Sequence, residues 1–303
     1  MKYYIGIDGG GTKTNAVLLD DTGKIYAAAT GRGINYNTIG MEAARMNLKA
    51  VTDSLLQDFS GTISAAAVGC AALSDKADEQ TTNALCGGVI PCENILLDSD
   101  VFIALSAAPD PEPKAIAICG TGSMAAGILT DGRRVTAGGW GHILGDEGSG
   151  YALSLEAIRT AIRASEGILP NTELINAVCD YFHIDQLTDL IGLFYGSAIP
   201  RDTVAAFAPR LFACAEAGDA AAITVIQTQG KAFADTCASL LARMPDGTPL
   251  YLWGGIFEHH ELFRKTFSAY LQNIHPDVKI SLLPLSPEIG AVHAAMETEE
   301  TDG

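Results

Sequence analysis

Short apolar runs alternate with longer stretches of helical periodicity in the first third of the chain. The short runs predict five strands, at 2–8, 16–19, 25–30, 64–71 and 95–97. Stretches with the spacing of an amphipathic helix predict three helices, at 41–59, 76–85 and 101–107. Three strands followed by alternating helices and strands indicate a mixed sheet with helices packed on it.

The order of elements begins again after residues 109–114 (PDPEPK), a proline-rich polar segment that is typical of a domain boundary. Beyond it, the pattern predicts strands at 115–119, 124–129, 250–253 and 279–283. It predicts a helix-rich stretch over 148–244 and further helices at 258–271 and 287–296. The acidic tail, 297–303, is expected to be frayed. We therefore expect an α/β protein of two domains, 1–108 and 109–303.

Composition supports a compact protein with two cores, since 48% of the 303 residues are apolar and 18% are charged. The net charge of −17 disfavours nucleic acid, whose phosphates would be repelled. The start, MKYYIGID, lacks the apolar core of a signal peptide, and no run approaches the length of a membrane span, so no membrane partner is expected. Seven scattered cysteines without a CxxC pair favour free thiols in a reducing cytoplasm, and they do not support zinc or iron–sulfur binding.

The first two predicted strands are joined by residues 9–11 (GGG), a turn that a ligand can approach closely because no Cβ is in the way. Its N–H groups can surround an anion, and the hydroxyls of Thr12 and Thr14 can add donors. Asp8 is placed to hold a hydrated divalent cation against bound phosphates. These residues predict a phosphate site, and the alternative is an ordinary glycine hairpin. A Walker loop is excluded by its missing motif, and the dinucleotide fingerprint by the strand that follows the turn.

A second turn of this kind, residues 120–123 (GTGS), opens the second predicted domain between two strands. One such turn is a weak signal, but the repetition of strand, glycine–threonine turn and strand in both halves strengthens it. Two such turns, facing each other across a cleft, would clamp a polyphosphate from both sides.

Glycines are densest at 138–150 (GGWGHILGDEGSG), where six of them disfavour any regular helix or strand. Asp146 can accept hydrogen bonds from ligand hydroxyls, while Glu147 can cap the helix that begins near Ser149. The alternative is that both acidic residues only cap that helix. Trp140 can serve either as loop packing or as a platform for a sugar ring.

Two carboxylates, Asp98 and Asp100, lie where a predicted strand runs into a helix. A carboxylate at this position could accept a hydroxyl proton during phosphoryl transfer, or it could cap the helix.

Two polar or glycine-containing segments complete the candidate site. Asn35 can donate to and accept from a sugar hydroxyl, whereas Asn37 can cap the helix that follows. Gly254 and Gly255 come after a late strand and permit close approach of an adenine or a ribose, although glycine is also common at such turns without a ligand.

These segments, in this order, resemble those of the eukaryotic-type N-acetylglucosamine kinases within the BadF/BadG/BcrA/BcrD ATPase family. The resemblance extends through the chain: IGIDGGGTKT at 5–14, GRGINYNTIG at 31–40, LDSDVFIAL at 97–105, ICGTGS at 118–123, GGWGHILGDEGSGY at 138–151, LWGGIF at 252–257 and SPEIGA at 286–291. It implies the fold of sugar kinases, Hsp70 and actin, with two ribonuclease-H-like (actin-like ATPase) domains around a nucleotide- and sugar-binding cleft. It also implies that the last helix, about 287–297, packs back on the first domain.

The resemblance further implies transfer of the γ-phosphoryl group of ATP, with Mg²⁺, to an amino sugar, usually at the 6-hydroxyl. Asp100 has the spacing of the family's catalytic base, Asp98 does not, and Asp8 is similar to the residue that holds Mg²⁺ through water. The residues similar to the sugar site are Asn35, Gly122, Gly139 and Asp146. Those similar to the nucleotide site are Gly10, Gly11, Thr12, Lys13, Gly120, Thr121, Gly254 and Gly255. No residue matches one that reads an N-acetyl group, and residues 69–74 are the candidate region.

The expected substrate is N-acetylglucosamine, with glucosamine and N-acetylmuramic acid as alternatives. The anionic lactyl group of the last would need a cation, for which Arg32 is the candidate. A less favoured function is an ATPase activator of a 2-hydroxyacyl-CoA dehydratase, but Cys86 and Cys92 lack the expected cluster pattern. A ROK-type regulator or kinase is disfavoured because no helix-turn-helix precedes the first turn and the zinc motif is missing. Relatives of this kind are commonly dimers, so a homodimer is expected.

Overall fold

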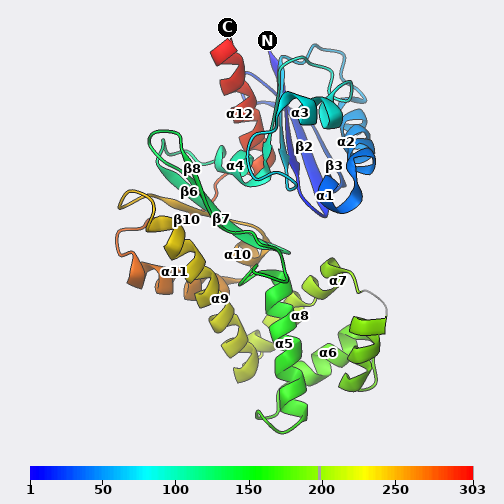
Figure 1. Cartoon of the computed structure of the whole chain (residues 1–303), viewed down its shortest axis with the longest axis vertical. Coiled ribbons are helices and arrows are strands. Elements are labelled where there is room, and N and C mark those ends of the chain that lie inside the picture. Colours follow the sequence, from blue (N-terminus) through cyan, green and yellow to red (C-terminus); the bar gives the residue numbers. More distant parts are fainter. Residues whose placement is uncertain (197–198, 303) are drawn as a thin grey trace. The chain divides into compact units, whose positions relative to one another are not determined.

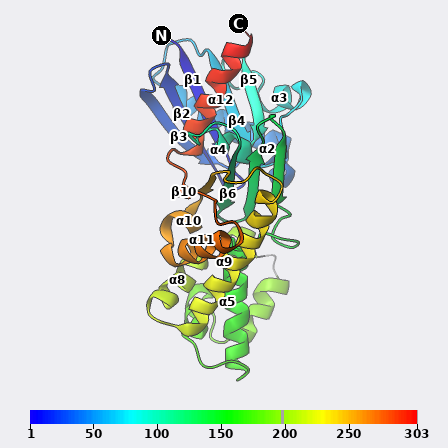
Figure 2. The same cartoon turned by 90° about the vertical axis from the view of Figure 1, so that its left-hand side faces the viewer.

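The computed structural model describes residues 1–196 and 199–302 (Figures 1 and 2). The chain forms two compact units. The first contains residues 1–114 together with the segment from Leu283 onward, and the second contains Ala115–Leu282. In the part of the chain that the structure describes, no helix is both long enough and apolar enough to cross a membrane.

The first unit is a five-stranded sheet of order β3-β2-β1-β4-β5. Its strands are β1 (Tyr3–Gly9), β2 (Lys13–Asp20), β3 (Ile25–Arg32), β4 (Ala65–Cys70) and β5 (Ile95–Ser99). The helices are α1 (Tyr36–Ile39), α2 (Met41–Leu56), α3 (Glu79–Cys86), α4 (Asp100–Leu105) and α12 (Pro287–Asp302). Strands β1, β2 and β3 pair antiparallel, whereas β4 and β5 continue the sheet in parallel from β1.

Strand β1 is buried on both faces of this sheet because its side chains alternate between two apolar clusters. Ile5 and Ile7 pack in the cluster that includes residues of α2, while Tyr4 packs in the cluster that includes residues of α12. Figure 2 shows α12 lying along the strands of this sheet. Gly6 permits this close contact, since a Cβ at that position would lie 2.0 Å from the carbonyl oxygen of Glu288.

The second unit repeats this strand order in a sheet β10-β9-β6-β7-β8, in which β6 takes the place of β1. Its strands are β6 (Lys114–Cys119), β7 (Ser123–Ile128), β8 (Arg134–Gly138), β9 (Leu250–Trp253) and β10 (Ile280–Leu282). Its helices are α5 (Gly150–Ser165), α6 (Leu174–Phe182), α7 (Arg201–Ala205), α8 (Ala208–Glu216), α9 (Ala220–Leu241), α10 (Gly255–His259) and α11 (Glu261–Ile274), with a 3₁₀ turn at Leu187–Asp189 and a π-helical turn at Gly192–Gly196.

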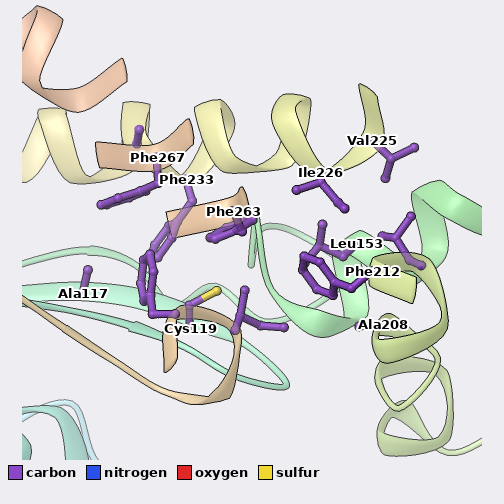
Figure 3. Packing of buried hydrophobic residues seen from close by; sticks show 14 of the residues in the cluster. Ala117, Cys119, Leu153, Ala208, Phe212, Val225, Ile226, Phe233, Phe263 and Phe267 are labelled. Carbon is purple, nitrogen blue, oxygen red and sulfur yellow. The ribbon is translucent and has the colours of Figure 1, made fainter. Parts of the chain in front are cut away.

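The core of the second unit joins its sheet to its helices (Figure 3). Phe233 of α9 packs with Phe267 of α11 at a ring-centroid distance of 5.6 Å, and Phe263 belongs to the same cluster. Toward the other end of this core, Ile226 of α9 gathers with Leu153 of α5 and Phe212 of α8. The long helix α9 therefore anchors both the sheet and the helices around α5.

Three local expectations were wrong. Strand β8 was not predicted; its residues are half-buried or exposed, so their apolar pattern is weak. The helix expected at 258–271 is two helices that meet at His260, which has an extended φ of −122°. The tail is not frayed from residue 297, because α12 continues to Asp302 and Tyr4 donates a 2.7 Å hydrogen bond to Glu299.

Candidate active site

The turn between β1 and β2 is held by the segment that enters α1. The amide of Gly33 donates to the carbonyl of Thr12 at 3.0 Å, and that of Ile34 donates to the carbonyl of Gly10 at 3.2 Å. A Cβ at Gly33 would lie 2.3 Å from the carbonyl oxygen of Gly11, so only glycine fits there. The glycine turn and the segment that carries Asn35 are thereby fixed to each other.

The turn presents fewer donors than its sequence predicts. The Gly10 amide already donates to the carbonyl of Lys13 at 3.0 Å. Thr14 is fully buried and donates its hydroxyl to the carbonyl of Arg32 at 2.8 Å, so the expectation that it serves a ligand was wrong. Arg32 is the last residue of β3, and this hydrogen bond places its backbone beside the turn. Gly11, Thr12 and Lys13 are exposed and form the accessible part of the turn.

Two of the predicted acidic residues meet at the carboxyl edge of the first sheet. In the ladder, Asp8 of β1 is opposite Gly69 of β4, which is opposite Asp98 of β5, and Asp100 follows at the start of α4. Gly69 lets α4 approach the sheet, since a Cβ there would lie 3.0 Å from the Cα of Asp100. Burial raises the pKa of Asp8 to about 7, and the carboxylate of Asp100 adds to that rise.

Asp100 is the carboxylate suited to accept a proton. Burial raises its pKa to about 6, and hydrogen bonds from the backbone of Val101 and from Ser99 act in the opposite direction. Asp98 is 2% exposed, and its Oδ1 accepts the amide of Ser99 at 2.7 Å. The buried Asp98 therefore serves the backbone at the end of β5.

Glu288, near the start of α12, joins this group and was assigned no role from the sequence. Its charge contributes to the raised pKa of Asp8, and Lys13 opposes that effect. Its Oε2 atom is buried without a hydrogen-bond partner among the described residues. The SPEIGA segment contains Glu288, but the place of this residue beside Asp8 depends on α12 packing back on β1.

Asn35 has two roles within the protein itself. Its Oδ1 accepts the amide of Asn37 at 3.1 Å and caps α1, and its Nδ2 donates to the carbonyl of Ala71 at 3.2 Å. The helix cap is therefore Asn35, not Asn37 as considered from the sequence; Asn37 donates to the carbonyl of Ala72 at 2.9 Å instead. An amide group offers two donors and two lone pairs, so Asn35 keeps capacity for a ligand. These bonds also place it beside the candidate region 69–74.

The second glycine turn lies at the corresponding edge of the other sheet. The Gly120 carbonyl accepts the amide of Gly150 at 2.7 Å, and the Thr121 carbonyl accepts that of Tyr151 at 3.3 Å. Gly254 has a φ of +103°, and a Cβ there would lie 2.5 Å from the carbonyl oxygen of Cys119. The structure thus brings residues 120–121 and Gly254 together within the second unit; Gly255 follows as the first residue of α10.

The glycine-rich loop after β8 directs Asp146 toward Gly122. Asp146 is 3% exposed and has a φ of +62°, a backbone conformation that glycine, asparagine and aspartate adopt more readily than most other residues. A Cβ on Gly122 would lie 2.8 Å from Oδ2 of Asp146. Gly139 has a φ of +74°, and its amide donates to the carbonyl of Ser123 at 3.2 Å.

Ser149 caps α5, accepting the amide of Ala152 at 3.2 Å. The expected capping by Glu147, and by Asp146 in the alternative, was therefore wrong. A short side chain in an extended conformation immediately before the helix suits this role better. The carboxylate of Asp146 is left to other partners.

Arg201, the first residue of α7, was missed from the sequence. Its Nη2 lies 3.5 Å from Oδ2 of Asp146. Burial raises the pKa of Asp146, while Arg201 acts most strongly in the opposite direction. No sequence signal relates two residues this far apart. Trp140, in contrast, is 73% exposed, so it is not packed in the loop.

Two α/β units of the same strand order, each with a glycine turn between its first two strands, define the actin-like ATPase fold. The chain belongs to the BadF/BadG/BcrA/BcrD ATPase family, whose profile matches residues 5–298. A solved structure from Chromobacterium violaceum, provisionally described as an N-acetylglucosamine kinase, has the same fold with a TM-score of 0.76. It is 24% identical, and the match covers 96% of this chain and 98% of that one.

Three curated relatives are sugar kinases by name. The N-acetyl-D-glucosamine kinase of Dictyostelium discoideum is 25% identical over 98% of both chains. The N-acetylmuramic acid/N-acetylglucosamine kinase of Clostridium acetobutylicum is 26% identical over 96% of this chain and 97% of the relative. A glucosamine kinase of Vibrio cholerae is 32% identical over 75% of this chain and 76% of the relative.

Proposed function

We propose that this protein is an ATP-dependent kinase of amino sugars that phosphorylates N-acetylglucosamine at the 6-hydroxyl. Membership in an ATPase family and the names of the three relatives support phosphoryl transfer to a sugar of this class. Glucosamine and N-acetylmuramic acid are the alternative acceptors. The cytoplasm, where ATP is available and the seven free cysteines stay reduced, is the compartment in which we expect the reaction.

The observation that carries this proposal is the position of Asp100 beside Asp8 at the carboxyl edge of the first sheet. With a pKa of about 6, the Asp100 carboxylate is mostly ionised at neutral pH and can accept a proton. In the proposed reaction, the sugar hydroxyl gives its proton to Asp100 while its oxygen forms a bond to the γ-phosphorus. The bond from that phosphorus to the β,γ-bridging oxygen breaks, and ADP leaves.

The residues around Asp8 fit a magnesium ion. The donor set is carboxylate oxygen, which Mg²⁺ prefers, and it includes the unpartnered buried Oε2 of Glu288. The charges of Asp100 and Glu288 both raise the pKa of Asp8, so a nearby cation would relieve their repulsion. Asp8 would hold the ion through water, and a bound Mg²⁺ would neutralise phosphate charge.

The other predicted residues take the roles that their positions allow. In the first unit, Gly10, Gly11, Thr12 and Lys13 would contact phosphates, and Asn35 a sugar hydroxyl. In the second unit, Gly120 and Thr121 would contact phosphates, Gly254 and Gly255 the adenosine, and Gly122, Gly139 and Asp146 the sugar.

We also propose that the protein is a homodimer. Light scattering on a sizing column tests this oligomeric state.

A coupled ADP-release assay over N-acetylglucosamine, glucosamine, N-acetylmuramic acid and glucose tests the function. We expect ADP release that depends on at least one amino sugar, with little release from ATP alone. In Asp100→Asn the rate of this release should fall about 10²-fold or more. Rapid ATP hydrolysis without sugar would instead support the dehydratase activator. That function is disfavoured by Cys86, which is buried.

A further inference from the structure

The ion pair between Arg201 and Asp146 lies against Gly122, within the second unit. A Cβ on Gly122 would lie 2.5 Å from Nη2 of Arg201 and 2.8 Å from Oδ2 of Asp146. The space that a side chain at position 122 would need is therefore occupied by the two charged groups. Since Gly122 and Asp146 belong to the proposed sugar site, the guanidinium belongs there as well.

The guanidinium is only partly engaged. Its Nε is buried without a hydrogen-bond partner among the described residues, and the side chain as a whole is 39% exposed. Arginine carries five N–H donors and cannot lose its charge in a protein, whereas the contact with Asp146 involves Nη2. Donors and a permanent positive charge are left for a ligand that enters beside Asp146.

The charge at this position matters because the candidate substrates differ in charge. The free amine of glucosamine is an ammonium near neutral pH, N-acetylglucosamine is neutral, and N-acetylmuramic acid is anionic. A buried carboxylate alone attracts an ammonium, and a cation beside it cancels that attraction. Among the described residues, His142 also acts on Asp146, with an effect of the same sign as that of Arg201 but smaller. The charge of Asp146 also acts on the buried thiol of Cys119.

We propose that Arg201 sets the charge selectivity of the sugar site and makes this enzyme select N-acylated amino sugars over those with a free ammonium. Arg201 donates to the acylated substrate and cancels the field of Asp146, so a sugar ammonium gains nothing by entering. This inference rests on the proposed kinase function, and it places the cation for a lactyl carboxylate at Arg201. Arg32, the candidate from the sequence, belongs to the first unit.

The test compares kcat/KM for N-acetylglucosamine and glucosamine in the wild type, Arg201→Gln and Arg201→Lys. In Arg201→Gln, the preference for N-acetylglucosamine should fall about tenfold, because the charge of Asp146 is no longer cancelled and attracts the sugar ammonium at a partly screened site. Arg201→Lys should keep most of the preference. In Arg201→Gln, kcat/KM should fall more for N-acetylmuramic acid than for N-acetylglucosamine. Arg159→Gln is the matched control, since Arg159 is an exposed residue of α5 paired with Glu156.

The pH dependence separates charge selection from a structural effect. An amine similar to an α-amino group loses its proton near pH 8. At pH 9.5 glucosamine is therefore neutral, and the wild type and Arg201→Gln should show the same ratio of kcat/KM for the two sugars. A loss of the same size for both sugars at every pH, with an unchanged ratio, would overturn the proposal and leave Arg201 a structural role. Calorimetric binding of both sugars provides the same ratio without catalysis. Sugar binding without transfer would refute the kinase function alone, whereas no sugar binding would refute both.

Discussion

Replacing Asp146 by asparagine separates ligand binding from helix capping in the glycine-rich loop. Asparagine has the size of aspartate and tolerates the φ of +62° at this position, so the backbone should stay as it is. The change removes the negative charge and one acceptor oxygen. It leaves the cap of α5 intact, because that cap is made by Ser149.

The expected effect is a weaker complex with the sugar. A hydrogen bond to a charged group contributes about 1.5–3 kcal/mol and one between neutral groups about 0.5–1.5 kcal/mol. The difference of about 1–1.5 kcal/mol corresponds to a sugar KM raised about five- to tenfold, with the ATP KM unchanged. Asp146→Ala should raise the sugar KM by tenfold or more, but alanine at a positive φ also destabilises the loop by about 1–2 kcal/mol.

Ser149→Ala is the control. Loss of the α5 cap should cost about 1 kcal/mol and lower Tm by about 2–4 °C, with the sugar KM within twofold of the wild type. Steady-state kinetics and thermal melts of the two variants decide the point. If Asp146→Asn lowers Tm while leaving the sugar KM unchanged, or if Ser149→Ala changes the sugar KM more than Asp146→Asn does, the assignment of these two residues is wrong.

Three further predictions concern the two sheet edges. Asp100→Asn should lower kcat by about 10²-fold or more, while calorimetry finds unchanged sugar affinity. The kcat/KM of the wild type should fall below about pH 6. A larger loss of kcat in Asp98→Asn would show that Asp98, and not Asp100, is the base. Folding raises the pKa of Asp8 from 3.8 to about 7, so the ligand-free protein should lose stability as pH rises between those values. Asp8→Asn should therefore melt about 2–6 °C higher than the wild type at pH 8 and at the same temperature as the wild type at pH 4. Equal differences in melting temperature at both pH values would contradict this. Gly254→Ala should destabilise the protein by about 3 kcal/mol, since its Cβ would meet the backbone of Cys119 at a positive φ, whereas Gly255→Ala, with only His259 at 3.8 Å, should change the free energy of unfolding little in denaturant titrations.

The order of elements could be predicted because its signals are local. Apolar runs bounded by glycine turns marked β1, β2, β6 and β7, and helical periodicity marked α2 and α3. Elements with weak patterns were missed or misjudged. Strand β8 lacks a buried face, and the last turns of α12 carry mostly acidic residues, which read as a tail although Glu299 is bonded to Tyr4.

The candidate site was predictable to a similar extent. Asp8, Asp100 and Asp146 stand beside glycine turns or strand ends, and carboxylates at such positions indicate chemistry from the sequence alone. Glu288 and Arg201 have no such local sign. Each is recognised only from its neighbour in space, Asp8 in one unit and Asp146 in the other.

The fold class, the family and the two glycine turns could be inferred from the sequence alone, because motifs, turn conformation and apolar periodicity depend on residues close together in the chain. Which polar groups are available to a ligand became clear from the folded structure. In the folded protein, the hydroxyl of Thr14 donates to the carbonyl of Arg32, and Ser149 caps α5. Arg201 forms an ion pair with Asp146. A buried polar group must find a partner, and the partner that it finds depends on which distant segments the core brings together.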